Sequence, residues 1–265
     1  MNINKKKIKR DFLIKGYSIQ KVENKKNLKY IEDQIYKFLK KKVKFIHKNK
    51  QEFFNNFHNH VDKNNLNSLR VKLIENNLTK KKFKDCYYQI CKNTLELIVG
   101  NELVMQKGIN LSIQLPEDKS SLLTMHADTW SGDSAYEAVI WLPLVNCYKT
   151  KSMYILPASK YRYFEKIFKK QKNKTSNNIF LKIKKHVKWI NIKFGEFLIF
   201  NQTLPHGNII NKESETRISM NCRFKSVFSP YGTKGIGDFF EPIELKPITK
   251  IAINYELPII KNEIV

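Results

Sequence analysis

The sequence contains few of the residues that mark specialised classes of protein. Its 265 residues include only nine glycines, eight prolines and four cysteines, which excludes a fibrous chain and a disordered chain rich in glycine and proline. The cysteines form no C-x-x-C pair and have no histidine at zinc-finger spacing. We therefore expect a folded chain with a sizeable hydrophobic core and four reduced, structural thiols: Cys86, Cys91, Cys147 and Cys222.

Long apolar runs are also absent. The longest run, residues 138–145, has eight residues and contains Pro143, whereas about 18 are needed to cross a bilayer. The basic N-terminal residues, among them Lys5 and Arg10, are followed by no apolar segment of the kind that a secretory signal needs. The sequence therefore predicts neither an integral membrane protein nor a secreted one, and we expect a cytoplasmic location.

What the sequence has in excess is positive charge, +25 from 49 basic and 24 acidic residues. Such a charge is compatible with a protein that binds nucleic acid or another polyanion. However, only five basic residues are arginine, which is the residue best suited to bidentate recognition of phosphates and bases. Abundant asparagine and isoleucine accompany the lysines, so we attribute the charge mainly to compositional drift on solvated faces. Nucleic acid is not the expected partner, and a basic N-terminal binding surface is the alternative.

The hydrophobic pattern changes near Gly100. Before this residue, apolar side chains recur at the spacing of helices, in three sets: Ile31, Ile35, Leu39; Leu66, Leu69, Leu73; and Tyr87, Ile90, Cys91, Leu95, Ile98. Gly100 can end the last helix because glycine adopts the left-handed conformation without a Cβ clash. Beyond it, polarity alternates with period two in residues 111–115, which is typical of a half-buried strand. Further strand candidates are residues 137–143, 153–156, 197–200 and 217–224, and residues 169–178 are expected to form a solvated loop between strands.

Many short strands after a helical segment indicate an α+β fold. We expect a lysine-rich helical portion, residues 1–100, packed on a jelly-roll core, residues 101–265, as one structural unit. This is the architecture on which the candidate site residues are placed below.

The first candidate site is a histidine and an aspartate two positions apart, His126 and Asp128. On an extended backbone these side chains point to the same side, as two neighbouring ligands of one metal ion must. A second His-x-Asp triplet occurs at His60 and Asp62. It lies in the lysine- and asparagine-rich helical portion, where residues two apart diverge around a helix, and we interpret it as surface polar residues.

A third ligand and an arginine follow much later in the chain. His206 comes at the end of a strand candidate, and Arg217 follows it by eleven residues. Arg217 opens a strictly alternating segment, residues 217–224, whose polar face carries Arg217, Ser219, Asn221 and Arg223. A solvent-exposed polar face is the alternative reading of this strand. The combined pattern matches the facial triad of two histidines and one carboxylate in non-haem iron oxygenases, which leaves coordination positions open.

At these residues the sequence resembles the iron(II)/2-oxoglutarate-dependent oxygenases, in the branch similar to phytanoyl-CoA dioxygenase. Further segments resemble a bacterial subgroup found sporadically in carbohydrate-biosynthesis clusters, of which the streptomycin-pathway oxygenase is a distant relative. The resemblance covers about residues 66–250, and these segments carry it: residues 100–116, 120–123, 130–134, 141–145 and 152–154.

The resemblance implies a double-stranded β-helix, the cupin-like jelly-roll, with the metal at its mouth. It implies that His126, Asp128 and His206 bind Fe(II), that 2-oxoglutarate is the co-substrate, and that O2 is consumed. In the family an arginine at the position of Arg217 grips the distal carboxylate of the co-substrate, for which its planar fork is better suited than lysine. Arg223, on the same face, is the alternative clamp.

Other polar residues are candidates for supporting roles. Ser219 can add a hydrogen bond to the co-substrate, and Asn208 and Gln114 are further co-substrate candidates, although Gln114 can equally be a sheet-surface amide. The candidates for the substrate mouth are Trp130, Asp133 and Lys151. For Trp130, simple packing is an equal alternative.

We therefore expect an oxidoreductase that hydroxylates a small molecule and decarboxylates 2-oxoglutarate to succinate. The resemblance points to a sugar-derived substrate, and the excess of lysine favours one with an acidic group such as a nucleotide diphosphate. Because Asp128 stands where related halogenases have alanine or glycine, halogenation is not expected. Two alternatives stay open: a polyanion-binding jelly-roll without catalysis, and a metal-dependent cupin isomerase, against which Arg217 argues.

Overall fold

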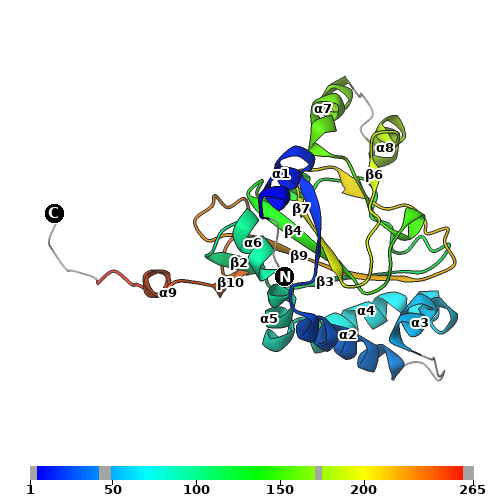
Figure 1. Ribbon diagram of the computed structural model, residues 1–265, viewed down its shortest axis with the longest axis horizontal. Coiled ribbons are helices and arrows are strands. Elements are labelled where there is room, and N and C mark those ends of the chain that lie inside the picture. The colour runs from blue at the N-terminus through cyan, green and yellow to red at the C-terminus, as the bar shows by residue number, and fades with distance from the viewer. Residues whose placement is uncertain (1–4, 42–48, 171–174, 259–265) are drawn as a thin grey trace.

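The structure is a computed structural model that describes residues 5–41, 49–170 and 175–258 (Figure 1). Its helices are α1 Lys5–Lys15, α2 Lys25–Lys40, α3 Lys50–Asn55, α4 Leu66–Leu73, α5 Lys81–Gln89, α6 Lys92–Ile98, α7 Tyr161–Lys170, α8 Ser176–Ile183 and α9 Pro247–Ile253. Its strands are β1 Tyr17–Lys21, β2 Leu103–Gln106, β3 Asn110–Gln114, β4 Glu137–Pro143, β5 Tyr154–Ile155, β6 Lys188–Trp189, β7 Glu196–Asn201, β8 His206–Gly207, β9 Arg217–Ser226 and β10 Phe240–Glu244.

A seven-stranded sheet forms the centre of the molecule, in the order β1-β7-β4-β9-β2-β10, with β3 as the seventh strand, paired with β9. The long strand β9 pairs with β4 on one side, and with both β3 and β2 on the other. All these pairings are antiparallel. A second, three-stranded antiparallel sheet has the order β6-β5-β8.

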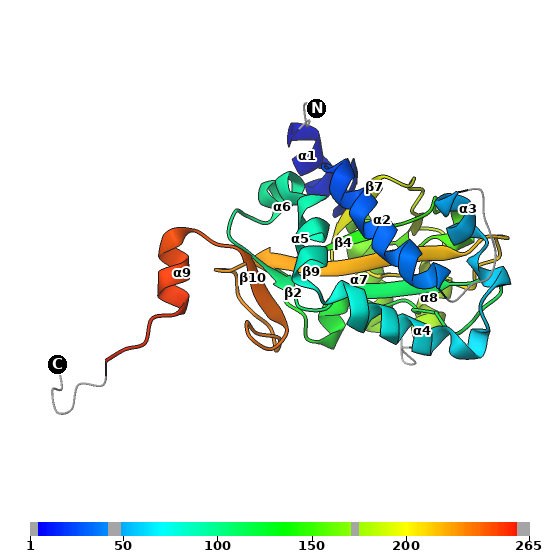
Figure 2. The same cartoon turned by 90° about the horizontal axis from the view of Figure 1, so that it is seen from below.

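Helices α2, α4 and α5 cover one face of the large sheet (Figures 1 and 2). Their apolar side chains join those of the strands in one hydrophobic cluster. In α2 the buried residues Leu28, Ile31, Ile35 and Leu39 recur at helical spacing, and Asn24 caps the helix by accepting the Asn27 N–H. The apolar residues of β9 lie in the same cluster. The alternation in β9 therefore leaves its polar face on the opposite side of the sheet.

The small sheet and helices α7 and α8 lie on the other side of the large sheet from α2 and α4 (Figure 1). A second hydrophobic cluster joins α7 and α8 to this region through Phe164, Ile179, Ile183, Tyr154 and Leu156. The polar face of β9 therefore lies on the side of the small sheet.

The first two expected helices before Gly100 and the expected strands after it are confirmed, with ends that differ by a few residues. The third helical set, Tyr87 to Ile98, is divided between α5 and α6, with Ile90 and Cys91 between the two helices. The N-terminal portion also contributes β1, which pairs with β7 at the edge of the large sheet. All four cysteines are free and buried, as expected.

The expectation of a loop between strands at residues 169–178 is wrong. The flanking elements are helices, because α7 continues to Lys170 and α8 starts at Ser176, while residues 171–174 lie outside the described part. The sequence predicts a loop at the end of α7 because this segment is rich in lysine. Helix α7 is amphipathic, and its apolar side carries Phe164, Ile167 and Phe168.

The C-terminal helix α9 projects from the body of the molecule (Figures 1 and 2). None of the described helices is long and apolar enough to span a membrane.

Candidate metal centre

Two histidines face each other: His206 in β8, and His126 in the segment directly before Asp128. His126 and His206 form an antiparallel bridge, in which each backbone N–H donates to the other residue's carbonyl, at 2.9 and 2.8 Å. Their ring centroids are 4.4 Å apart. The pairing of residues 80 positions apart brings together two of the three predicted metal ligands.

The hydrogen bonds of both rings fix which nitrogen can bind a metal. Nδ1 of His126 lies 2.7 Å from the carbonyl of Thr124, and Nδ1 of His206 lies 2.9 Å from that of Leu204. A carbonyl only accepts, so each Nδ1 carries the proton and donates. With the proton on Nδ1, each ring directs the lone pair of Nε2 toward a metal ion.

Asp128 supplies the carboxylate. Its backbone N–H donates to the carbonyl of Gln202 at 3.1 Å, and its Oδ1 lies 3.6 Å from Nε2 of His126. Ligand atoms of His126, Asp128 and His206 all lie within 4.8 Å of one another, and within the described residues this is the single such group of three. Two imidazoles and one carboxylate fit a divalent first-row transition metal.

Burial keeps the ring of His206 uncharged at neutral pH, as metal binding requires. Loss of solvent lowers the pKa of its ring to about 4, although the carboxylate of Asp128 opposes this. His126 is less buried, with 33% of its side chain exposed. The centre therefore has one deep ligand and one at the solvent side.

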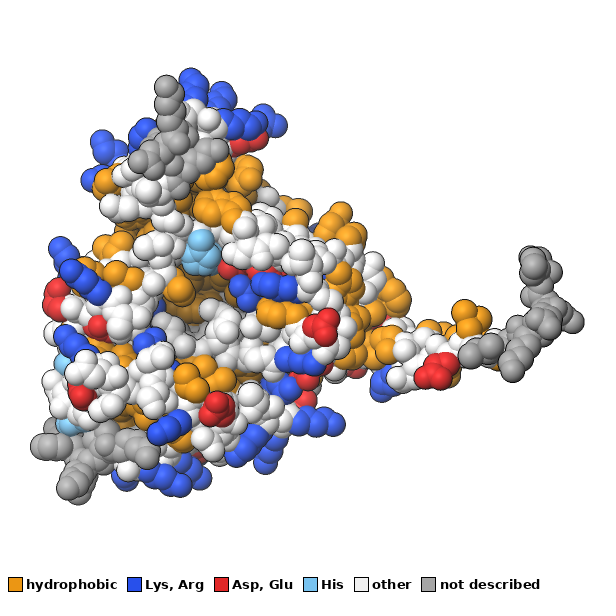
Figure 3. Space-filling view, turned by 180° about the vertical axis from the view of Figure 1, so that it is seen from behind, with side chains coloured by type: hydrophobic (Ala, Val, Ile, Leu, Met, Phe, Trp, Pro, Cys, Tyr) orange, Lys and Arg blue, Asp and Glu red, His pale blue; other side chains and the backbone are white. Residues whose placement is uncertain are grey.

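A cavity of about 330 Å³ opens beside these three residues. The polar face of β9 lines it together with residues of β3, and its apolar walls are Val139, Trp141, Met153 and Phe200. Figure 3 shows a hollow near the centre of one face of the molecule, with a histidine side chain at its edge. The polar residues that line the cavity include Ser112, His126, Asp128, His206, Asn208, Arg217, Ser219, Asn221 and Arg223.

Arg217 is a buried cation without a counterion inside the described structure. Only 3% of the residue is exposed, and its Nη2 donates to Oγ of Ser112 at 3.1 Å. Among the residues that the structure describes, its Nε and Nη1 are buried without a partner, as is Oγ of Ser219 on the same face of β9. Burial lowers the pKa of Arg217 to about 10, so it still carries its charge at neutral pH. An anionic ligand would satisfy these groups.

Asn208 and Gln114 hold neighbouring backbone. Asn208 lines the cavity, while its Oδ1 accepts the Leu123 N–H at 2.8 Å. Gln114 is fully buried beside Arg217 in the β3–β9 pairing, but it is not among the lining residues. Its Nε2 donates to the carbonyl of Ile209 at 2.6 Å, and its Oε1 is buried without a partner in the described structure.

Trp130 and Asp133 follow Asp128 in the chain, but neither lines the cavity. Trp130 is 44% exposed and stacks on Phe164 of α7, with ring centroids 6.0 Å apart. Asp133 is buried and pairs with Lys234, whose Nζ lies 2.7 Å from its Oδ1. Both residues therefore fix the surroundings of the ligand-bearing segment.

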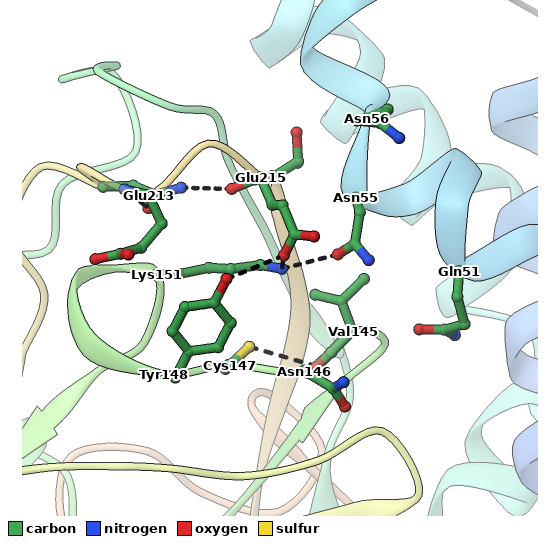
Figure 4. A network of polar contacts seen from close by, with 12 residues as sticks. Gln51, Asn55, Asn56, Val145, Asn146, Cys147, Tyr148, Lys151, Glu213 and Glu215 are labelled. Carbon is green, nitrogen blue, oxygen red and sulfur yellow. Dashed lines mark hydrogen bonds and ion pairs between the residues drawn. The ribbon is translucent and has the colours of Figure 1, made fainter.

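Lys151 lies outside the cavity, in a 3₁₀ turn between β4 and β5 that contacts the residues before β9 (Figure 4). It is fully buried, and its Nζ donates to Glu215 at 2.6 Å and to Oδ1 of Asn55 at 2.8 Å. The backbone N–H of Thr216 also donates to the carbonyl of Asn55 at 2.7 Å. These contacts join α3 to the residues directly before Arg217.

The second His-x-Asp triplet remains separate from this centre. Asp62 accepts the Asn64 N–H at 3.0 Å and so caps a short 3₁₀ helix.

The contact between Arg223 and Asp128, at 3.1 Å, was not predicted from the sequence. The alternation of residues 217–224 placed Arg223 on the correct face, but gave no sign of its partner.

Several solved structures share this fold, although no family model and no curated protein matches the sequence. The nickel complex of the non-heme monooxygenase ThoJ is 13% identical over 93% of each chain, with a TM-score of 0.53. The alpha-ketoglutarate-dependent carbocyclase SnoK from nogalamycin biosynthesis is 15% identical over 91% of this chain and 97% of its own, at 0.51. HygX from Streptomyces hygroscopicus, with nickel and 2-oxoglutarate bound, is 8% identical over 87% and 90%, at 0.50.

These likenesses show a shared fold of helices and antiparallel sheets.

The burial of Lys151 generates a prediction about stability. Glu215→Gln leaves a buried ammonium group without its carboxylate and should lower the free energy of unfolding by about 3 kcal/mol. Lys151→Met keeps the apolar stem and leaves only a partly exposed carboxylate, so about 1–2 kcal/mol is expected. Urea unfolding measures both.

The double variant separates the charge effect from packing. We expect Lys151→Met/Glu215→Gln to be more stable than Glu215→Gln alone, because the unpaired buried charge is gone. The exposed Lys160→Met is the control and should change stability by less than about 0.5 kcal/mol. Strictly additive losses in the double variant would contradict this account.

Proposed function

We propose that the protein is a non-haem Fe(II)/2-oxoglutarate-dependent oxygenase. The observation that carries the proposal is the buried, unpaired guanidinium of Arg217 in the same cavity as the two histidines and the aspartate. A metal centre alone fits many activities, but a metal centre beside a buried cation fits a co-substrate with an anionic end. The shared fold supports the same assignment.

The proposal includes the architecture. The two antiparallel sheets would form the double-stranded β-helix of this class, with the metal centre between them. The N-terminal portion, residues 1–100, would belong to the same structural unit as residues 101–265, because helices of the former and strands of the latter share one hydrophobic cluster.

His126, Asp128 and His206 would hold the metal. Two neutral imidazoles and one carboxylate bind Fe(II) and leave open positions. When bound, Fe(II) supplies the activation of O2, of which one oxygen atom enters succinate and the other the product, with release of CO2. The contribution of the chain is to present Nε2 of both rings, held by their Nδ1 hydrogen bonds, toward the carboxylate.

Arg217 would bind the distal carboxylate of 2-oxoglutarate. Its unpartnered Nε and Nη1 are free to donate to an incoming carboxylate, and Ser219 can donate a further hydrogen bond. The apolar side chains of Val139, Trp141 and Phe200 would exclude water from the bound chain of the co-substrate. Asn208 and Gln114 would act mainly by fixing the backbone around it.

Hydroxylation of a small molecule is the proposed outcome. The substrate would be a sugar-derived metabolite with an acidic group, a proposal that rests on the sequence resemblance and on the excess of lysine. Of the residues assigned to the substrate mouth, Trp130 is the exposed one, so it is the one that could contact a sugar ring. The proposed location is the cytoplasm.

The proposed function leads to three predictions, of which the first concerns metal binding. His126→Ala, Asp128→Ala and His206→Ala should each abolish stoichiometric Fe(II) binding and succinate formation, because each removes one of three ligands. Equilibrium dialysis under nitrogen and a succinate assay measure the two effects. His60→Ala and Asp62→Ala are the matched controls, and loss of iron in these variants with retention in Asp128→Ala would show that the wrong triplet had been chosen.

The second prediction concerns the co-substrate. Arg217→Lys should leave Fe(II) bound but raise the KM for 2-oxoglutarate about 30-fold, since a bidentate contact worth ~2 kcal/mol becomes a single point charge. Arg162→Lys, on the exposed face of α7, is the control. A normal KM in Arg217→Lys together with a raised KM in Arg223→Lys would transfer the role to Arg223.

The third prediction concerns the substrate. The iron-loaded protein and 2-oxoglutarate are incubated with separate pools of nucleotide sugars, amino acids, acyl thioesters and nucleic acid. Succinate above the uncoupled background, with a product mass increase of one oxygen atom, is expected only with the nucleotide sugars. Coupled turnover confined to another pool would overturn the carbohydrate proposal and leave the oxygenase proposal intact.

A further inference from the structure

The guanidinium group of Arg223 lies beside the carboxylate of the metal centre. Its Nη2 is 3.1 Å from Oδ1 of Asp128, and both side chains are largely buried. Arg217, six residues earlier on the same face of β9, has two nitrogens without partners, whereas Arg223 is fully engaged. The two arginines in this cavity therefore have different tasks.

Two glutamines hold Arg223 in place. Its Nε donates to Oε1 of Gln202 at 3.2 Å, and its Nη1 donates to Oε1 of Gln106 at 3.1 Å. The ring of Phe239 lies 5.9 Å from its Cζ. All three guanidinium nitrogens thus have an acceptor, and the planar fork has little freedom to rotate.

Gln202 also fixes the backbone of Asp128. Its carbonyl accepts the Asp128 N–H at 3.1 Å, while its side chain holds Arg223 and donates to the carbonyl of Ser134. Gln202 directly follows β7, and Arg223 lies in β9. The backbone of Asp128 is therefore held at the end of β7, and its carboxylate is held by β9. A carboxylate held in this way is preorganised for a metal ion.

The charge of Arg223 is balanced within the cluster. Oδ1 of Asp133 lies 3.8 Å from Nε of Arg223 and 2.7 Å from Nζ of Lys234. Two carboxylates therefore face two cations, so Arg223 does not add a net positive charge beside an incoming metal ion.

We propose that Arg223 is a positioning residue that orients the carboxylate of Asp128 for metal binding, with Gln106 and Gln202 holding the arginine. The inference rests on the proposed metal centre and goes beyond its three ligands. It assigns a structural reason to the second arginine of β9. It also predicts that Gln106, which contacts Arg223 and does not line the cavity, affects metal affinity.

The test is the affinity of the metal-free protein for Co(II), measured by titration calorimetry, with the visible absorption of bound Co(II) as a second readout of the ligand set. Arg223→Gln should weaken binding about 10–100-fold, as loss of a group that orients a metal ligand does. Arg223→Lys and Gln106→Leu should give smaller losses, because each keeps part of the network. Arg162→Gln, on the exposed face of α7, is the control and should bind like the unaltered protein.

Thermal unfolding of the metal-free variants separates positioning from a general loss of stability. The proposal requires weaker Co(II) binding and an altered spectrum in variants that remain folded at the temperature of the titration. Should Arg223→Gln fail to fold, Gln106→Leu decides by the same criterion. Unchanged Co(II) affinity in the folded variants overturns this inference alone, whereas absence of Co(II) binding in the unaltered protein overturns the proposed function and this inference together.

Discussion

The buried charge of Arg217 is the constraint on which this account of the molecule depends. A guanidinium group stays protonated even where burial lowers its pKa to about 10, and burying it without a counterion costs several kcal/mol. Inside the described structure its one hydrogen-bond acceptor is the hydroxyl of Ser112. A fold that keeps such a group beside a possible metal centre is stabilised when an anion binds there, which links the architecture to the proposed co-substrate.

Strand β9 connects this charge to everything else in the site. Its apolar face packs under α5, where the buried hydroxyl of Tyr87 donates to the carbonyls of Ile140 and Met220. Its polar face carries Arg217 and Arg223 into the cavity. The Lys151 network fixes its beginning, and the glutamines around Arg223 fix it near its other end. The strand is thereby held at both ends of the cavity it lines.

Local patterns in the sequence were sufficient for much of the fold and for the outline of the site. The alternation of residues 217–224 predicted which side chains face the cavity, because side chains of a strand point to opposite faces in turn. The helical spacing in residues 31–39 predicted α2. The sequence did not reveal that Lys151 is buried with Glu215, nor that Arg223 contacts Asp128, because these contacts join segments 64 and 95 residues apart. Side-chain contacts between segments so far apart leave no periodic signal in the sequence.

The most direct test of the central claim is the selectivity of the metal-loaded protein for dicarboxylates. The Ni(II)-loaded protein is titrated by calorimetry with 2-oxoglutarate and with 2-oxobutyrate, which has the same 2-oxo acid group but no distal carboxylate. The account predicts one 2-oxoglutarate bound per chain, with an affinity at least ~30-fold higher than that for 2-oxobutyrate, because only the former neutralises Arg217. Equal affinities, or no binding of 2-oxoglutarate, would contradict it.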